Sequence, residues 1–200
     1  MVISIFEKDS EKPKLKRKVS FESKLKMNKR NIPFAYAEKL FDVDVDFFVA
    51  HNVKVLLSDF DNTLVPYGST TPSEECLSYL ARLNEKGIKV IIASNGLGKR
   101  VLPVAAAMGL EAVHLLRKPF AGPMKRLIKE RGWNKDELML VGDQIQTDVL
   151  AANGAGIRCL LVEPLAKHEP PWTKFNRIFD RPKRKKLKKK GLLPPWNEVA

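Results

Sequence analysis

The chain has 200 residues, of which 44% are hydrophobic and 30% are charged, and its formal net charge is +13 at pH 7. This length fits one domain with room for a sizeable core. Cys76 and Cys159 lack metal-type spacing and are expected to be buried free thiols, as in a reducing compartment. No apolar stretch approaches the roughly 20 residues that span a membrane. Acidic residues near the start argue against a secretory signal or mitochondrial presequence, so a cytoplasmic protein is expected.

The positive charge is concentrated in the two flanks of the chain. Residues 1–30 carry a net charge of +6 and residues 166–190 carry +9, whereas residues 31–165 carry −1. We therefore expect a basic N-terminal extension at 1–30, a folded domain at 31–165 and a basic C-terminal extension at 166–200. Each flank fits a solvated tail, an RNA-binding arm or an anchor for an anionic membrane. Residues 20–31 have the pattern of a short basic amphipathic helix, which favours a membrane surface.

Apolar runs and turn residues predict alternating helices and strands. The predicted strands are 53–58, 88–93, 112–115, 138–141 and 158–162. The predicted helices are 33–39, 73–86, 97–108, 121–131 and about 147–153. The second of these begins at a Thr-Pro-Ser-Glu start signal, and Gly87 ends it. Such βαβ alternation indicates an α/β protein with a parallel sheet between two helical layers, in a three-layer α/β/α, Rossmann-like arrangement.

Two carboxylates, Asp59 and Asp61, follow the first long predicted strand. In open α/β sheets, ligands bind at the carboxyl ends of the strands. A pair of carboxylates at such a point can divide the work between nucleophilic attack and proton transfer. The alternative is a simple turn, because Asp and Asn favour turns and helix caps.

Later strand ends supply further polar groups. Ser94, Asn95 and Gly96 follow the strand at 88–93 and can form an anion cradle. Lys118 stands before a proline, and Asp143 and Asp148 follow the strand at 138–141. A nucleophile, a hydroxyl, a cation and metal-type carboxylates together predict an active site. The three histidines are scattered and are assigned no chemistry: His51, His114 and His168.

In this order, the four segments resemble the four motifs of the haloacid dehalogenase superfamily of phosphatases. The match spans roughly residues 40–162. The stretches DNTLV, RKP and GDQIQTDVLAAN resemble the YqeG-type branch, subfamily IIIA, which is similar to phosphatidylglycerophosphate phosphatases. The resemblance implies a haloacid dehalogenase-like phosphatase domain at 31–165.

The resemblance also implies a role for each residue. Asp59 is expected to be the nucleophile that forms an aspartyl-phosphate, and Asp61 the general acid and base. The metal ligands implied are Asp59, the main-chain carbonyl of Asp61, and Asp143, holding Mg²⁺, an ion that suits oxygen ligands and phosphate substrates.

The remaining implied roles concern the phosphate and the supporting residues. Ser94, Asn95 and Lys118 are expected to bind the substrate phosphate, and Lys118 also to orient the nucleophile. Thr63 is expected to fasten the loop through its hydroxyl, and Asp148 to support the metal site indirectly.

The spacing of the motifs leaves no room for a cap domain, because only 35 residues separate Asp59 from Ser94 and 24 separate Ser94 from Lys118. A capless site is open and admits a bulky substrate. With the resemblance, this favours a Mg²⁺-dependent phosphomonoesterase acting on phosphatidylglycerophosphate, an anionic phospholipid, peripherally at the inner face of a membrane. Two alternatives stay open: a phosphatase of a soluble sugar phosphate or nucleotide, with an oligomer covering the site, and an RNA-associated factor with a phosphatase fold.

Overall fold

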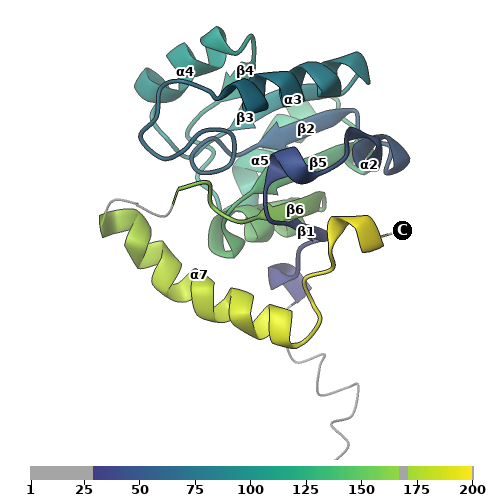
Figure 1. Ribbon diagram of the computed structural model, residues 1–200, viewed down its shortest axis with the longest axis vertical. Helices are drawn as coiled ribbons and strands as arrows, with labels where there is room; N and C mark the ends of the chain where they lie inside the picture. Colours follow the sequence, from purple (N-terminus) through teal and green to yellow (C-terminus); the bar gives the residue numbers. More distant parts are fainter. Residues whose placement is uncertain (1–28, 167–170, 200) are drawn as a thin grey trace, which may run out of the picture.

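The computed structural model describes residues 29–166 and 171–199, with the side chains of 171–177 excepted. Its centre is a sheet of six strands in the order β1-β6-β5-β2-β3-β4 (Figure 1). All of the pairings between neighbours are parallel. The strands are β1 Ala35–Ala37, β2 Val55–Ser58, β3 Lys89–Ala93, β4 Glu111–Val113, β5 Leu138–Gly142 and β6 Arg158–Val162. The predicted parallel α/β sheet is confirmed.

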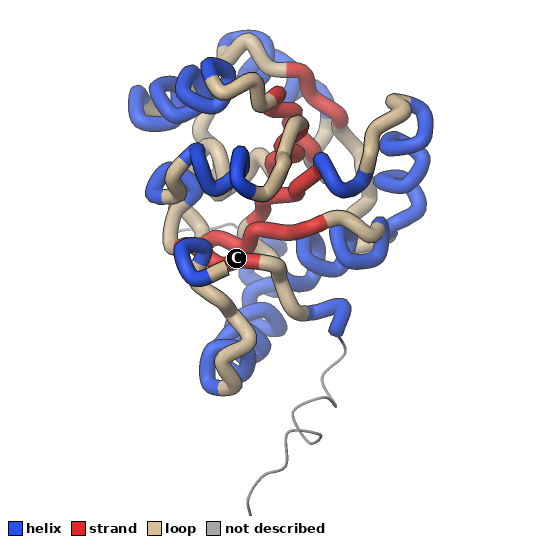
Figure 2. Tube along the Cα trace, turned by 90° about the vertical axis from the view of Figure 1, so that its right-hand side faces the viewer, coloured by secondary structure: helices blue, strands red, loops and turns tan. Residues whose placement is uncertain are grey.

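Helices cover both faces of the sheet, and Figure 2 shows the strands between them. One face packs against α2 Val45–Ala50, α3 Glu74–Glu85 and α4 Gly98–Ala107. The other face packs against α5 Ala121–Glu130, α6 Leu150–Ala155 and α7 Pro171–Lys189. Along β2 the buried side chains alternate, with Leu56 in the first core and Val55 and Leu57 in the second. A strand buried on both faces explains why the sequence is apolar without interruption there.

Short elements complete the described chain. The 3₁₀ helices are Lys29–Asn31, Leu40–Asp42, Lys135–Glu137 and Trp196–Glu198. The start predicted for α3 is confirmed, because the Ser73 hydroxyl accepts a hydrogen bond from the Cys76 N–H at 3.1 Å. Cys76 and Cys159 are both free and buried, as expected.

The helix predicted at 33–39 is wrong, because Ala35–Ala37 form the edge strand β1. Ala35 and Ala37 are buried while Tyr36 is only partly covered, and the strand pairs with Leu160–Val162 of β6. Three residues are too few to show the period-2 pattern of a strand. The helix expected near 147–153 begins earlier, as a π-helical turn, Ile145–Val149, that continues into α6.

The described part of the basic C-terminal segment packs on the domain and is not a solvated tail. Leu187 and Leu193 are buried in the second core. The Tyr36 N–H donates to the carbonyl of Pro194 at 2.8 Å, so the chain after α7 runs along the β1 edge. The boundary drawn at residue 165 stays a prediction. Residues 1–28 lie outside the described part, and with them most of the amphipathic helix expected at 20–31.

Within the part of the chain that the structure describes, every helix is too short or too polar to span a membrane.

The order of the strands determines where the catalytic side chains lie. β2 lies between β5 and β3, so the carboxyl ends of these three parallel strands meet at one edge of the sheet. The motifs of Asp59, Ser94 and Asp143 follow these three strands, and the Lys118 motif follows β4, which is parallel to β3 and ends at the same edge.

Candidate active site

Asp59 lies directly after β2, at the centre of that edge. Its backbone N–H donates to the carbonyl of Val141 at 2.8 Å, which holds the start of the loop against β5. The side chain is 13% exposed, so a small part of the carboxylate is accessible. A carboxylate in this position is fixed by the strand and reachable by a substrate.

Lys118 is the cation of the site and is almost completely buried. Its Nζ lies 2.7 Å from Asp59 Oδ1 and 2.7 Å from Asp148 Oδ1. Asn95 fixes the backbone of Lys118 from both sides: its Nδ2 donates to the Lys118 carbonyl and its Oδ1 accepts from the Lys118 N–H, each at 2.7 Å. Both ends of the Asn95 side chain are therefore engaged with Lys118. Asn95 thus positions the cation, and the phosphate contact expected of it stays a prediction, because its amide nitrogen carries a second N–H.

Asp148 is the buried counterpart of Asp59. Its Oδ2 accepts hydrogen bonds from the Gln144 N–H at 3.0 Å and from the Thr147 hydroxyl at 3.1 Å. Gly142 permits this approach, because a Cβ atom there would lie 2.3 Å from Asp148 Cγ. With Lys118 on the other oxygen, both carboxylate oxygens of Asp148 are occupied. This arrangement fits the supporting role that the sequence predicts for it.

Three carboxylates lie close enough together to hold a metal ion. One oxygen each from Asp59, Asp143 and Asp148 lies within 4.8 Å of the others. Asp143 and Asp148 are buried, and Lys118 bonds Asp59 and Asp148. Hard carboxylate oxygens and a concentration of negative charge fit a divalent cation. Asp59 and Asp143 would hold it directly, and Asp148 would orient Lys118 beside it.

The burial of Asp59 and Lys118 affects the pKa of both groups. Burial raises the pKa of the Asp59 carboxyl to about 6; the Lys118 ammonium opposes the rise and the Asp148 carboxylate adds to it. Burial alone would lower the pKa of Lys118, but the carboxylates of Asp148 and Asp59 outweigh it, and the net shift is upward. Lys118 is therefore firmly cationic.

Asp61 lies on the same loop but faces another cation. Its Oδ1 accepts a hydrogen bond from Nη2 of Arg100, at the start of α4. The Arg100 guanidinium lies over the rings of Phe60 and Tyr67, at 5.1 and 5.3 Å from their centroids. This arginine lies outside the four sequence motifs. Its position six residues after Ser94, at the start of a helix that begins at the site edge, was the available signal.

The loop from Asp59 to Val65 is closed by Asn62. Asn62 Oδ1 accepts from the Tyr67 N–H at 3.0 Å and from the Ala166 N–H at 3.2 Å. The expected role of the Thr63 hydroxyl is not met in the described residues, where its buried Oγ1 has no hydrogen-bond partner. Ser94 is placed as expected, at the end of β3, and its Oγ accepts from the Gly96 N–H at 2.9 Å. Its own hydroxyl hydrogen stays available for a phosphate oxygen.

Helix α7 fastens the loop that carries Asp143. Arg184 Nη2 donates to the Asp143 carbonyl at 2.7 Å, and the buried Asp180 accepts from the Ile145 N–H at 2.7 Å. Arg184 Nε in turn lies 3.3 Å from Asp180 Oδ2. A segment that the sequence presents as a basic flank therefore positions a predicted metal ligand.

The mouth of the site combines a cavity with exposed apolar side chains. The cavity has a volume of about 490 Å³ and is lined by Asn95, Lys118, Pro119, Gln146, Thr147 and Phe179. Phe179 of α7 lines this cavity and is about half exposed. Three further large apolar residues are more exposed: Leu97 and Phe120, just before α4 and α5, and Ile178 of α7. We call these four residues the apolar rim. Leu97 comes just after Gly96, and Phe120 two residues after Lys118.

Two known proteins are similar in sequence to most of this chain, and a family profile matches part of it. A family profile described as HAD-hydrolase-like matches residues 115–171. The chain is 30% identical over 167 residues to the probable phosphatase YqeG of Bacillus subtilis (strain 168), covering 84% of this chain and 96% of the relative. It is 27% identical over 180 residues to phosphatidylglycerophosphate phosphatase 1, chloroplastic/mitochondrial, of Arabidopsis thaliana, covering 82% of this chain and 50% of that relative.

One solved structure with a similar fold is the cobalt-bound deoxy-D-mannose-octulosonate 8-phosphate phosphatase (YrbI) of Haemophilus influenzae. The identity is 17% and the TM-score 0.45, over 63% of this chain and 75% of that one. The fold, the motif geometry and the similarity to YqeG lead to one conclusion: the chain belongs to the haloacid dehalogenase superfamily. It is a phosphatase, and its sequence places it in the YqeG-type branch of that superfamily.

Proposed function

We propose that this protein is a Mg²⁺-dependent phosphomonoesterase that removes the terminal phosphate of phosphatidylglycerophosphate at a membrane surface. The observation that carries the proposal is the apolar rim around an uncapped catalytic edge. The similarity to a protein named as a phosphatidylglycerophosphate phosphatase supports the choice of lipid. Mg²⁺, when bound, offsets the negative charge of the phosphate and of the carboxylates around it.

In the first step, one oxygen of Asp59 attacks the phosphorus atom and forms an aspartyl-phosphate. The bond from phosphorus to the leaving oxygen breaks, and protonated Asp61 gives its proton to that oxygen. Lys118 offsets charge on the phosphoryl group and holds Asp59 in place at 2.7 Å. The Ser94 hydroxyl donates to a phosphate oxygen.

In the second step, a water molecule attacks the phosphorus atom and Asp61, now a carboxylate, takes its proton. The bond from phosphorus to Asp59 breaks, which releases phosphate and restores the nucleophile. Asp61 thus acts first as an acid and then as a base, so it must be near the leaving oxygen and accessible to water. Its side chain is 23% exposed, in agreement with this task.

The open edge and the rim favour a substrate held in a bilayer. A lipid phosphate stays in the membrane, so the enzyme must bring its site to the surface. Exposed Leu and Phe side chains insert into the interface, and neighbouring cations attract anionic lipids. On α7, the exposed face that carries Ile178 also carries Arg181 and Lys185, which supplies charge of the required sign.

Phosphate release tests the proposal directly. We expect Mg²⁺-dependent release from phosphatidylglycerophosphate in mixed micelles to exceed release from sugar phosphates and nucleotides at equal concentration. Preference for the soluble panel would overturn the choice of lipid. If RNA inhibited the enzyme strongly and anionic vesicles did not relieve the inhibition, nucleic acid would be the better partner for the basic flanks.

Substitutions in the apolar rim test the membrane role separately. The double variant Leu97→Ser/Phe120→Ser should lose activity on lipid vesicles and keep activity on p-nitrophenyl phosphate, because neither side chain belongs to the catalytic network. Leu77→Ser is the matched control, since Leu77 is an exposed leucine on α3. Equal losses on both substrates would contradict a membrane role for the rim.

A further inference from the structure

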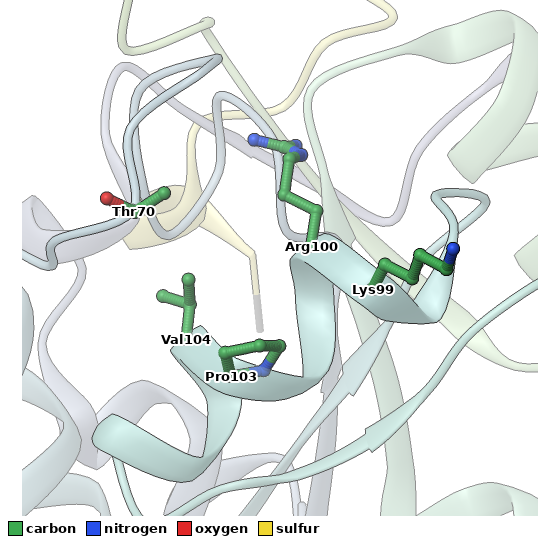
Figure 3. Close-up of a pocket in the computed structure, with 5 residues that line it drawn as sticks. All are labelled: Thr70, Lys99, Arg100, Pro103 and Val104. Carbon is green, nitrogen blue, oxygen red and sulfur yellow. The ribbon is translucent and has the colours of Figure 1, made fainter.

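A second cavity lies at the start of α4, and the Arg100 that bonds Asp61 forms part of its wall. Its volume is about 360 Å³, and it is lined by Thr70, Lys99, Arg100, Pro103 and Val104. In Figure 3 the Arg100 side chain extends from α4 between Thr70 on one side and Lys99 on the other. Neither an aspartate nor a glutamate lines the cavity. Its two charged residues, Lys99 and Arg100, are both cations, so an anion is the charged ligand that they favour.

Aromatic contacts hold the Arg100 side chain in place, and its guanidinium has a hydrogen-bond donor that no described residue uses. The rings of Phe60 and Tyr67 fix the plane of its guanidinium. Nη2 donates to Asp61, whereas the buried Nη1 has no hydrogen-bond partner within the described residues. A buried donor without a partner is costly, and phosphate oxygens are well suited to the fork of a guanidinium. Arg100 therefore has a donor that an anionic ligand can satisfy when the guanidinium shifts toward the cavity.

The position of Asp61 relates this cavity to the reaction. Under the proposed function, Asp61 protonates the leaving oxygen, so the cavity lined by its partner Arg100 lies on the leaving-group side of the site. While Asp61 Oδ1 accepts from Arg100, that oxygen is not directed at a leaving group. An anion that draws the guanidinium away would release Asp61 for its task.

We propose that the pocket around Arg100 and Lys99 binds a second anionic group on the leaving-group side of the substrate, and that this group is a phosphodiester. This inference rests on the proposed function and deepens it. Phosphatidylglycerophosphate carries a phosphodiester on the same glycerol as the scissile monoester. The pocket thus selects substrates with two phosphates, and the second phosphate displaces Arg100 from Asp61.

A pair of soluble substrates isolates the second phosphate from the lipid. Glycerophosphoglycerophosphate carries the monoester and the phosphodiester, whereas glycerol 3-phosphate carries the monoester alone. We expect kcat/KM to favour the first by about 10- to 100-fold, the range for a charge-assisted hydrogen bond to phosphate. Part of the gain should appear in kcat, because the diester frees Asp61. Arg100→Met should abolish the preference, and Arg100→Lys should restore part of it.

A binding assay keeps this inference separate from the identity of the true substrate. Glycerophosphoglycerol carries the phosphodiester and no monoester, and we expect it to inhibit the hydrolysis of p-nitrophenyl phosphate by the unaltered protein. The inhibition should weaken at least tenfold in Arg100→Met and stay unchanged in Arg126→Met, an exposed arginine on α5.

The outcomes are distinct. Inhibition that depends on Arg100, without turnover of either glycerol substrate, would support the pocket and overturn the proposed lipid function. The proposed pocket would be wrong if Arg100→Met lowered kcat/KM equally on both glycerol substrates. It would also be wrong if glycerophosphoglycerol inhibited Arg100→Met as strongly as the unaltered protein. Inhibition by phosphatidylglycerol micelles but not by glycerophosphoglycerol would assign the effect to the lipid chains and likewise overturn it.

Discussion

Two cations face the two carboxylates of the Asp59–Asp61 loop, and they are held in opposite ways. Lys118 is buried, bonds Asp59 and Asp148 at 2.7 Å, and has its backbone fixed by Asn95. Arg100 has a side chain 33% exposed, bonds Asp61, and is steadied by two aromatic rings. The first pair is a permanent part of the site. The second is open to exchange, because a partly exposed ion pair contributes less stability than a buried one and an incoming anion can compete for it.

The difference follows from the tasks of the two carboxylates. Asp59 must keep one position to attack phosphorus, and a buried network provides that rigidity. Asp61 must gain and lose a proton within one turnover and must meet both the leaving group and water. A fixed buried partner would prevent this, whereas a cation at the surface permits it.

The largest expected effect separates the two carboxylates. Asp59→Asn should lower activity about 10³-fold or more on any phosphomonoester, because it removes the nucleophile. Asp61→Asn should lower activity about 10²- to 10⁴-fold on an alkyl phosphate. On p-nitrophenyl phosphate, whose leaving group needs no proton, the first step should be spared, so p-nitrophenol should appear in a burst and the loss of turnover should fall on the second step, where Asp61 is the base. The measurement is kcat for each variant on both substrates. Asp42→Asn, an exposed aspartate, serves as the control. If Asp59→Asn were fully active, the aspartyl-phosphate mechanism would be wrong.

The second prediction compares how much Lys118 and Arg100 contribute to the free energy of unfolding. Lys118→Met should lower the free energy of unfolding by about 3–5 kcal/mol, because it leaves the buried Asp148 carboxylate without its cation. Arg100→Met should lower it by about 1 kcal/mol or less, since that pair is partly exposed.

Denaturant unfolding measures both changes. Adding Asp148→Asn to Lys118→Met should recover much of the lost stability and none of the activity, since the double variant removes the unpaired charge but not the need for the ammonium. Equal stability losses in the two single variants would refute the distinction between a buried and an exchangeable cation.

The strand ends could be predicted from sequence because their chemistry is local. Asp59, Ser94 and Asp143 each follow an apolar run, and parallel strands bring their ends to one edge of the sheet. Lys118 was recognised by its order among the motifs. The structure brings all four together around the β2, β3 and β5 ends, as the sequence predicts.

The rest depends on packing that no local pattern records. Lys99 and Arg100 are two charges at a helix start, a pattern typical of solvated residues, and only the fold turns Arg100 toward Asp61. Asp180 is a single acid in a basic run, so charge counting assigned it to a flank, although it is buried against Ile145. β1 has three residues, too few to show the period of a strand. Long-range contacts decide each case.

The smallest effect tests whether α7 supports the metal site at a distance. Arg184→Met removes the donor to the Asp143 carbonyl and the partner of Asp180, so the loop that carries Asp143 should lose part of its fixed position. We expect the Mg²⁺ concentration for half-maximal activity to rise about tenfold, the lower end of the effect of partners that support metal ligands. Lys185→Met, an exposed cation on the same helix, should leave that concentration unchanged. If Arg184→Met lowered stability and left the Mg²⁺ dependence unchanged, α7 would be a structural cover only. A rise in the Mg²⁺ requirement at saturating substrate would mean that Arg184, unlike the exchangeable Arg100, belongs with Lys118 among the cations that keep the catalytic edge in one conformation.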